Sequence, residues 1–328
     1  MTARSLSASD VDIAEAARLL RAGVLVAFPT ETVYGLGADA TNGIAVARLY
    51  AAKGRPSFNP LIAHVSDLIA ARHIARFNDA ANRLAAFWPG PLTLVLPKNP
   101  GCPVTELATA GLETIAVRIP AHPVARDLLA RFGRPIVAPS ANRSGHVSPT
   151  DAQHVLADLD GRVNVVLDGG STPVGLESSI VACIDNSIQL LRPGGLPRAD
   201  LERALGHALA VEVAAINDGG EAPIAPGMLS SHYAPRAHIR LNADCVRAGE
   251  AVLAFGAKYP LGGQEAAMLL NLSERGDLVE AAANLFSHLR ALDASGVASI
   301  AVMPVPFEGL GEAINDRLAR AAAPRGSS

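Results

Sequence analysis

The first two hundred residues alternate short runs of aliphatic and β-branched residues with amphipathic stretches of helical periodicity. This alternation is typical of an α/β domain, in which helices cover a sheet. One predicted helix, 8–22, begins after a Ser9 cap, and 29–41 is expected to be a loop leading to a helix that ends near Lys53 and Gly54. Further helices are predicted at 80–87, 123–132, 150–159 and 199–209, and strands at 24–28, 61–65, 92–96, 114–119, 136–138, 163–167, 179–184 and 188–191.

The pattern changes after residue 210. The segment 217–235 is rich in Gly, Pro, Ser and Ala, a composition typical of a linker. Strands predicted at 238–241, 251–255 and 297–303 then alternate with helices at 277–292 and 311–322, which indicates a smaller three-layer α/β unit. The expected organisation is a domain at 8–210, a linker at 211–236 and a second domain at 237–328.

Composition limits the class of protein. Of the 328 residues, 49% are apolar and 18% are charged, so the chain can bury sizeable cores. The N-terminus is polar and no apolar run is long enough to cross a membrane, so a cytoplasmic protein without membrane contact is expected. Cys102, Cys183 and Cys245 are too widely spaced for a disulfide framework or a zinc site. A net charge of -3 favours a nucleotide over a nucleic-acid duplex as the partner.

Two short motifs carry the candidate chemistry, Lys53-Gly54-Arg55 and Ser140-Ala141-Asn142. Two cations separated by one glycine can point at one polyanion, while a hydroxyl and an amide orient it without adding charge. This pattern indicates phosphoryl or nucleotidyl transfer. The plainer alternative is a helix end capped by basic residues plus an unrelated turn, which the neighbouring motifs disfavour.

Two common nucleotide-binding motifs are excluded. Gly35-Leu-Gly37-Ala-Asp-Ala40 matches the glycine pattern of a dinucleotide-binding loop, but no acidic residue between Asp39 and Asp67 can hold the ribose. No P-loop pattern occurs in the sequence. Hydroxyls at Thr30 and Thr32 follow the predicted strand 24–28, at the strand end where open α/β sheets bind ligands. Because neither motif is present, an ATP site in this chain would be built from other residues.

Further motifs occur in order along the chain and closely resemble those of the YrdC/Sua5 family of threonylcarbamoyl-AMP synthases. The resemblance is dense over 10–205 and looser beyond. The two-domain length and the segment Ser231-His-Tyr-Ala-Pro235 resemble the longer, Sua5-type branch. The other motifs are PTETVYGLG at 29–37, KGRPSFNPLIAH at 53–64, PGPLT at 89–93, TIAVRIP at 114–120, APSANRSG at 138–145 and LRPG at 191–194.

The resemblance implies a fold and a reaction. The expected fold is a twisted open mixed sheet with flanking helices and a concave ligand face, followed by a smaller Rossmann-like α/β/α domain. The expected reaction joins L-threonine, bicarbonate and ATP into threonylcarbamoyl-adenylate and pyrophosphate, for the N6-threonylcarbamoyl modification of adenosine 37 in ANN-decoding tRNAs. A downstream tRNA threonylcarbamoyltransferase is the implied partner, and tRNA itself is expected to bind only weakly or indirectly.

The resemblance also implies roles for individual residues. Lys53 and Arg55 would stabilise charge on the phosphate oxygens, and Ser140 and Asn142 would orient those oxygens. The implied ligands of L-threonine are Thr32, His64, Arg118, the Ala138 backbone and Ser178, with the Arg118 fork on the carboxylate. The implied ligands of ATP are Arg55, Asn59, Thr114, Ser140, Ser148, Arg192 and Tyr233.

Mg²⁺ is expected to accompany ATP and to bind phosphate oxygens and water, because no carboxylate pair stands out as a protein site. No organic cofactor is implied. Ser178-Ser179 stands where the family more often has Ser-Thr, and threonine binding should survive because Ser178 is retained. The linker around Tyr233 is expected to close over the nucleotide as a lid, with a passive tether as the alternative.

Two other functions remain open at this stage. A carbamoyltransferase of the hydrogenase-maturation type has a similar domain, but it would also carry an acylphosphatase-like region and paired zinc-binding cysteines, and the sequence has neither. A non-catalytic RNA-binding module is disfavoured by the acidic balance and the 4% aromatic content. His64 and Arg118 also have structural alternatives, a core histidine and a surface salt bridge. Nothing in 237–328 shows a catalytic constellation.

Overall fold

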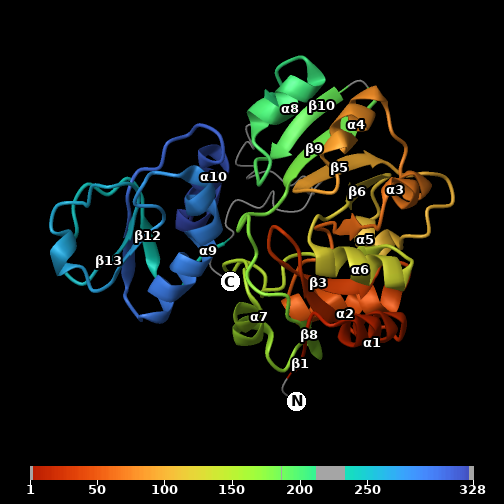
Figure 1. The fold of residues 1–328 in the computed structure, drawn as a ribbon, viewed down its shortest axis with the longest axis horizontal. Coiled ribbons are helices and arrows are strands. Elements are labelled where there is room, and N and C mark those ends of the chain that lie inside the picture. Colours follow the sequence, from red (N-terminus) through yellow and green to blue (C-terminus); the bar gives the residue numbers. More distant parts are fainter. Residues whose placement is uncertain (1–2, 186, 212–232, 325–328) are drawn as a thin grey trace.

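The computed structural model describes residues 3–185, 187–211 and 233–324. Two α/β domains lie side by side, the first built on a large sheet and the second on a small one (Figure 1). The strands of the large sheet are β1 (Arg4–Leu6), β2 (Val26–Pro29), β3 (Tyr34–Asp39), β4 (Ile62–His64), β5 (Leu92–Pro97), β6 (Thr114–Arg118), β7 (Ile136–Val137), β8 (Val165–Leu167), β9 (Ser179–Ile184), β10 (Ser187–Arg192) and β11 (Ala210–Val211). The sheet is mixed, in the order β1-β8-β2-β3-β7-β4-β6-β5-β9-β10-β11.

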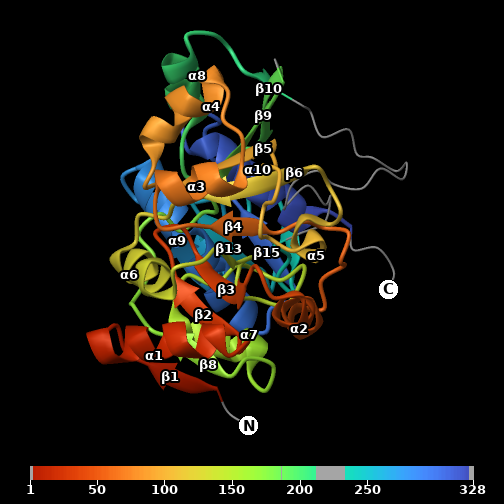
Figure 2. The ribbon, with the colours of Figure 1, turned by 90° about the vertical axis from the view of Figure 1, so that its right-hand side faces the viewer.

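Helices flank this sheet (Figure 2). The predicted cap is confirmed, because the Ser9 side chain accepts a hydrogen bond from the Asp12 backbone at the start of the first helix. The predicted end of the second helix is also confirmed, since Gly54 takes up a left-handed conformation with φ 60° directly after Lys53. The helices are α1 (Asp10–Arg21), α2 (Gly43–Lys53), α3 (Leu68–Ile74), α4 (Asp79–Leu84), α5 (Glu106–Thr109), α6 (Pro123–Phe132), α7 (Ala152–Leu159) and α8 (Arg198–Leu205), with a 3₁₀ turn η1 (Ala85–Phe87).

The predicted loop 29–41 is wrong in its second half, where β3 runs antiparallel to β2. Gly35 and Gly37 interrupt the alternation of side chains by which a strand is recognised in a sequence. The structure shows why a side chain is excluded at Gly37: a Cβ there would lie 2.9 Å from the Phe28 ring. The short elements β1, α3, α5 and β11 were also not predicted.

Strand pairing brings distant residues to one edge of the large sheet. His64 and Arg118 are register partners at the carboxyl ends of the parallel strands β4 and β6. β5 runs antiparallel to β6, and β9 runs parallel to β5, with Leu92 beside Ser179. The start of β9, next to Ser178, therefore lies at the same edge as His64 and Arg118.

The C-terminal domain has a parallel sheet in the order β12-β15-β13-β14. Its strands confirm the predictions near 238, 251 and 299, and the strand at 269–271 was not predicted. The elements are β12 (His238–Arg240), β13 (Ala251–Ala254), η2 (Gly263–Glu265), β14 (Leu269–Asn271), α9 (Leu278–Ala294), β15 (Ser299–Val302) and α10 (Gly311–Ala322).

The third layer of this domain differs from the expected layer of helices. The side chains of Leu253 and Ile300 share one core with both α9 and α10, so these helices lie on the same face of the sheet. On the opposite face, Val252 and Ala301 pack against Val246 and other residues of the connecting segments. The connections from β12 to β13 and from β13 to β14 contain no α-helix, so segments of loop cover that face.

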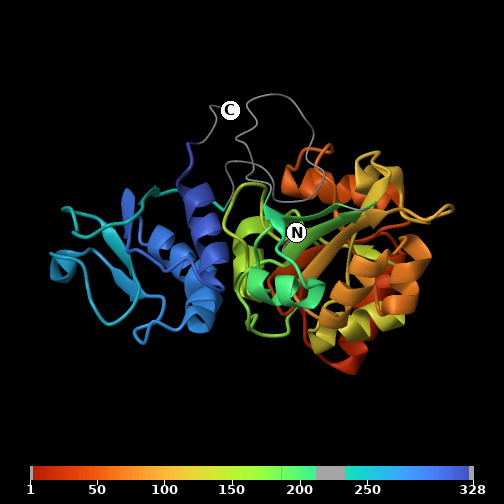
Figure 3. The same cartoon turned by 90° about the horizontal axis from the view of Figure 1, so that it is seen from above.

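The two helices of the small domain face the N-terminal domain (Figure 3). Apolar residues of both domains form one core, in which Val33 and Val147 join Phe286 of α9. The guanidinium of Arg198 also pairs with Glu312 of α10, with Nε 3.1 Å from Oε2. The domains therefore share a packed interface.

Much of the predicted linker, including Ser231 and His232, lies outside the described residues, and the lid prediction lies with it. None of the helices that the structure describes has the length and the apolar run required to span a lipid bilayer.

Candidate active site

A small cavity of about 50 Å³ lies where the strand ends of the large sheet meet the end of the linker. Its walls bring together most of the residues that the sequence singled out for threonine or ATP. The lining consists of Thr32, Val33, Arg55, Ile62, His64, Arg118, Ala138, Pro139, Ser140, Glu177, Ser178, Arg192 and Tyr233. Lys53, Asn59, Thr114, Asn142 and Ser148 were also expected in the site but are not among these lining residues.

Arg118 is held rigidly at one end of this pocket. It is 4% exposed, so the alternative of a surface salt bridge does not apply. Its Nη2 donates to Glu31 Oε1 at 2.6 Å, its Nη1 donates to Thr32 Oγ1 at 2.9 Å and its Nε donates to the Gly90 carbonyl at 3.3 Å. A guanidinium has five N–H donors, so each terminal nitrogen keeps one for a ligand carboxylate.

Glu31, which the sequence reasoning did not select, is the partner that orients this guanidinium. Burial by itself raises the pKa of Glu31, but Arg118 and backbone donors outweigh it and hold the pKa below its usual value. The backbone N–H of Ala121 donates to the second carboxylate oxygen at 2.9 Å. In the sequence, the position of Glu31 between Thr30 and Thr32 could have marked it as a candidate site residue.

His64 is a neutral imidazole in the wall of the pocket. Burial, assisted by the positive charge of Arg118, lowers the pKa of His64 to about 3. Its Nδ1 lies 3.2 Å from the Ile62 carbonyl, and the backbone of Ile136 also bonds the ring. So low a pKa makes His64 a poor general base at neutral pH, which disfavours a Ser140–His64 nucleophile pair.

Arg55 and Arg192 place two buried guanidinium groups in the same pocket. Burial lowers the pKa of Arg55 to about 10, so the group is still cationic at neutral pH. Arg55 donates to the Asn59 and Pro60 carbonyls at 3.3 and 3.0 Å, and Arg192 Nη2 donates to the Ser178 carbonyl at 2.8 Å. A buried cation whose described partners are neutral carbonyls, as for Arg55, favours an anionic ligand.

The sequence suggested that Lys53 and Arg55 point at the same ligand, but only Arg55 lines this pocket. Lys53 stays in the last turn of α2, and Gly54 turns the chain so that Arg55 alone reaches the cavity. The Nζ of the buried Lys53 donates to the backbone carbonyls of Ser140 and Asn142. Burial lowers the pKa of Lys53 well below its usual value. Lys53 therefore holds the loop that carries Ser140.

The other expected residues surround the pocket at different distances. Asn142 Nδ2 donates to the Arg143 and His146 carbonyls at 2.8 Å, which shapes the loop after Ser140. Asn59 lies under Arg55 through its carbonyl, and Ser148 Oγ lies 2.5 Å from Glu177 Oε1. Thr114 begins β6, four residues before Arg118, and therefore lies roughly 13 Å along the strand from it.

The C-terminal domain reaches the site through Arg317 of α10, a residue that the sequence reasoning missed. Arg317 is fully buried, pairs with Glu177 at 2.8 Å and donates to the Pro193 carbonyl at 3.0 Å. Its guanidinium carbon lies 5.1 Å from the centre of the Tyr233 ring, which also stacks on Phe286 at 5.6 Å. In the sequence, the place of Arg317 on the apolar face of an amphipathic helix could have marked it as a buried, paired charge.

The lining is a poor match to a metal held by the protein. It contains one carboxylate, Glu177, which already binds Arg317 and Ser148. Among the described residues, no group of three His, Cys, Asp or Glu side chains could hold a metal ion. That Mg²⁺ binds phosphate oxygens and water stays a prediction.

Comparisons with known proteins agree across the whole chain. The Sua5/YciO/YrdC family model, described as "Telomere recombination", matches residues 18–194, and the model of the threonylcarbamoyl-AMP synthase C-terminal domain matches 196–323. The threonylcarbamoyl-AMP synthase of Bacillus subtilis is 42% identical, over 98% of this chain and 95% of its own. That of Pyrococcus abyssi is also 42% identical, over 93% and 92%. The crystal structure of P. abyssi Sua5 with L-threonine superposes with a TM-score of 0.88, at 38% identity and 98% coverage of both chains.

The fold and the cationic pocket define a YrdC-like α/β enzyme that transfers nucleotidyl groups. The chain belongs to the threonylcarbamoyl-AMP synthase family, in its two-domain Sua5 branch. The likeness to HypF, at 22% identity and a TM-score of 0.51, is a likeness of fold alone.

Proposed function

We propose that this enzyme forms threonylcarbamoyl-AMP and pyrophosphate from L-threonine, bicarbonate and ATP. One observation carries the proposal: a single pocket joins an oriented carboxylate-binding fork, Arg118, to two buried cations, Arg55 and Arg192. The crystal structure of a relative, P. abyssi Sua5, is a complex with L-threonine. The lining therefore has groups suited to an amino-acid carboxylate and groups suited to a phosphate.

In this proposal Arg118 binds the carboxylate of L-threonine through its two remaining terminal N–H groups. The hydroxyls of Thr32 and Ser178 are within the same lining and can bond the threonine side chain or amine. His64 is neutral and adds no positive charge that would repel the amine. The amine then attacks bicarbonate, giving a carbamate and releasing water.

The carbamate oxygen next attacks the α-phosphorus of ATP, and pyrophosphate leaves. Negative charge grows on the phosphate oxygens, and Arg55, Arg192 and the Ser140 hydroxyl, which all line the pocket, would stabilise it. Preorganised donors of this kind typically contribute about 3–4 kcal/mol each to lowering the barrier. Lys53 and Asn142 act indirectly, since both hold the loop that presents Ser140.

The biological role that goes with this reaction is supply of the activated threonylcarbamoyl group for adenosine 37 of ANN-decoding tRNAs. A tRNA threonylcarbamoyltransferase would consume the adenylate. The cytoplasm remains the expected compartment, because ATP and tRNA are both present there.

The test is pyrophosphate release from ATP, bicarbonate and Mg²⁺, with and without L-threonine, with the adenylate identified by mass spectrometry. We expect threonine-dependent release by the wild-type enzyme and a loss of roughly 100-fold in Arg55→Gln, as for removal of one preorganised donor. Lys53→Ala should also lose activity, through displacement of Ser140. Threonine binding measured by calorimetry should survive in Arg55→Gln, which serves as the control for folding.

Release without threonine would contradict the proposal and favour a carbamoyltransferase. No release under any of these conditions, with threonine binding intact, would favour a binding module.

A further inference from the structure

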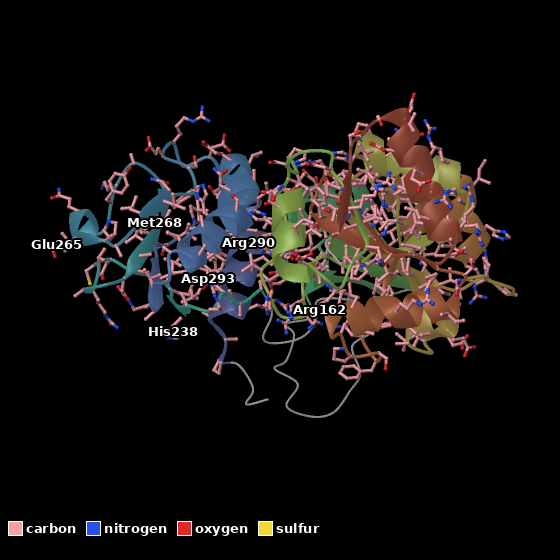
Figure 4. All side chains as sticks on the ribbon, turned by 90° about the horizontal axis from the view of Figure 1, so that it is seen from below. Arg162, His238, Glu265, Met268, Arg290 and Asp293 are labelled. Atoms are coloured by element: carbon pink, nitrogen blue, oxygen red, sulfur yellow. The ribbon has the colours of Figure 1, made fainter. Side chains whose placement is uncertain are left out.

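A second and larger cavity, of about 760 Å³, lies at the junction of the two domains. Its walls come from the loop 143–147, α7, the segment 234–236 and α9. Figure 4 shows Arg290 of α9 at this junction, where its guanidinium contacts Asp158 of the N-terminal domain. The cavity shares no described lining residue with the small pocket, so it is a separate site.

The charges of this junction cavity are unbalanced. Arg290 lies 3.0 Å from Asp158, and Arg236 lies 3.3 Å from Asp293, so these two pairs cancel. The third guanidinium, Arg143, is exposed, and the described residues give it no hydrogen bond or ion pair. The cavity therefore keeps one uncommitted positive charge in its wall.

The rest of the lining suits a small molecule. The volume lies within the range of roughly 300–1,000 Å³ that is usual for small-molecule sites. Val147, Ala157 and Ala291 give apolar wall, while His146 places an imidazole 3.6 Å from Asp158. An apolar wall beside a guanidinium that pairs with none of the described residues suits a phosphate-bearing organic molecule.

The wall that carries Arg143 is also tied to the catalytic pocket. The Ser144 N–H donates to the Lys53 carbonyl at 2.9 Å, and Asn142 Nδ2 donates to the His146 carbonyl at 2.8 Å. The Ala234 N–H, directly after Tyr233, donates to the Gly145 carbonyl at 2.8 Å. An anion bound at Arg143 would therefore contact the loop that Lys53 and Asn142 shape.

We propose that the junction cavity binds a phosphate-bearing small molecule, with Arg143 as its main charged ligand. The shared chemistry is a terminal phosphate group, which pyrophosphate or a mononucleotide such as AMP can supply. This site is additional to the proposed catalytic reaction, and no step of that reaction requires it.

The test is calorimetric titration of the full chain with pyrophosphate and, separately, with AMP. The titration is made in an Arg55→Gln background, which weakens phosphate binding in the small pocket. We expect one molecule bound per chain, and adding Arg143→Gln should weaken it by about tenfold or more, since one charge-assisted hydrogen bond is lost. Arg126→Gln, an exposed arginine on α6, is the matched control and should have no effect.

The wild-type chain gives an independent count that does not rely on the Arg55 variant. Two pyrophosphates per chain should fall to one in Arg143→Gln, with threonine binding unchanged. A wild-type chain that binds one pyrophosphate, still sensitive to Arg143→Gln, would support the junction site while counting against the proposed catalytic site.

The relative affinities of the two probes identify the source of the phosphate. Tighter binding of pyrophosphate assigns the site to an inorganic anion, and tighter binding of AMP assigns it to a nucleotide. The proposal is overturned if neither probe binds in the Arg55→Gln background, or if Arg143→Gln behaves like Arg126→Gln. Arg143-dependent binding of a short RNA, without binding of either probe, would also overturn it in favour of a nucleic-acid surface.

Discussion

The two cavities of this enzyme differ in size and in the burial of their charged residues: the smaller cavity has the more deeply buried ones. The small pocket has about 50 Å³ of space, yet Arg118 and His64 in its wall are almost completely buried. The junction cavity has about 760 Å³, but Arg236 in its wall is 80% exposed in the ion pair with Asp293. The larger cavity is therefore not the one that contains the buried candidate catalytic residues.

The difference shows what a reactive site requires. Charges that stabilise a transition state must be oriented before the reaction and shielded from water, and strand ends inside a sheet satisfy both conditions. Exposed charges in the wall of the junction cavity, such as Arg236 and Arg143, are screened by water and suit equilibrium binding better than catalysis. Four experiments can break or sharpen this comparison.

The largest expected effect is that of Arg118→Ala. Removing this fork leaves Glu31 buried without its partner, and threonine loses its carboxylate ligand, so binding should weaken by about 3–5 kcal/mol, more than 100-fold. Calorimetry with L-threonine measures this loss. In the junction cavity, Arg236→Ala removes an exposed ion pair and should change the stability by less than about 1 kcal/mol. Similar effects of the two substitutions on threonine binding would remove the distinction between the cavities.

The next effect tests whether the C-terminal domain supports the small pocket. Arg317→Met should lower the free energy of unfolding by about 3 kcal/mol, because it removes the ion-pair partner of the buried Glu177 carboxylate. Chemical denaturation measures the change. The double variant Arg317→Met with Glu177→Gln should recover much of the stability, since the unpaired charge is gone. A double variant as unstable as the single one would show that packing, not charge, is the role of Arg317.

A smaller effect concerns pH. His64 has a folded-state pKa of about 3, below its unfolded value, so the unfolded chain takes up the proton first as the pH falls. The resulting stability is present in full above about pH 6.5 and is lost progressively toward pH 3, at up to about 1.4 kcal/mol per pH unit. Thermal unfolding between pH 7 and pH 5 measures the slope. His64→Gln should show a shallower slope, and an unchanged slope would assign the pH dependence to other groups.

The smallest expected effect is that of Thr93, which tests whether the hydroxyls of the small pocket are oriented by their neighbours. The buried Thr93 hydroxyl lies 2.7 Å from Ser178 Oγ and fixes its direction. Thr93→Val should weaken threonine binding by about 1 kcal/mol, close to fivefold, with little change in packing volume. Thr109→Val, a buried threonine whose hydroxyl bonds only the Glu106 carbonyl at 3.2 Å in the described structure, is the matched control. Equal effects of both substitutions on threonine binding would argue against an orienting role for Thr93.

Much of the fold could be predicted because local patterns carry it. The strand at 179–184 and the helix at 123–132 have the predicted bounds, since apolar periodicity and caps mark them directly. β3 could not be predicted, because Gly35 and Gly37 lack the side chains that form a pattern. The second face of the small sheet was also not predictable, because alternation does not say whether helices or loops will cover it.

The sequence by itself determined the family, the reaction class and most of the side chains of the small pocket, because ordered motifs encode chemistry locally. Only the tertiary structure decided how those side chains divide their work. Lys53 binds carbonyls while Arg55 reaches the cavity, although one glycine separates them. Glu31 and Arg317 become part of the site through contacts across 87 and 140 residues of sequence. Such contacts depend on strand register and domain packing, which no local pattern of residues records.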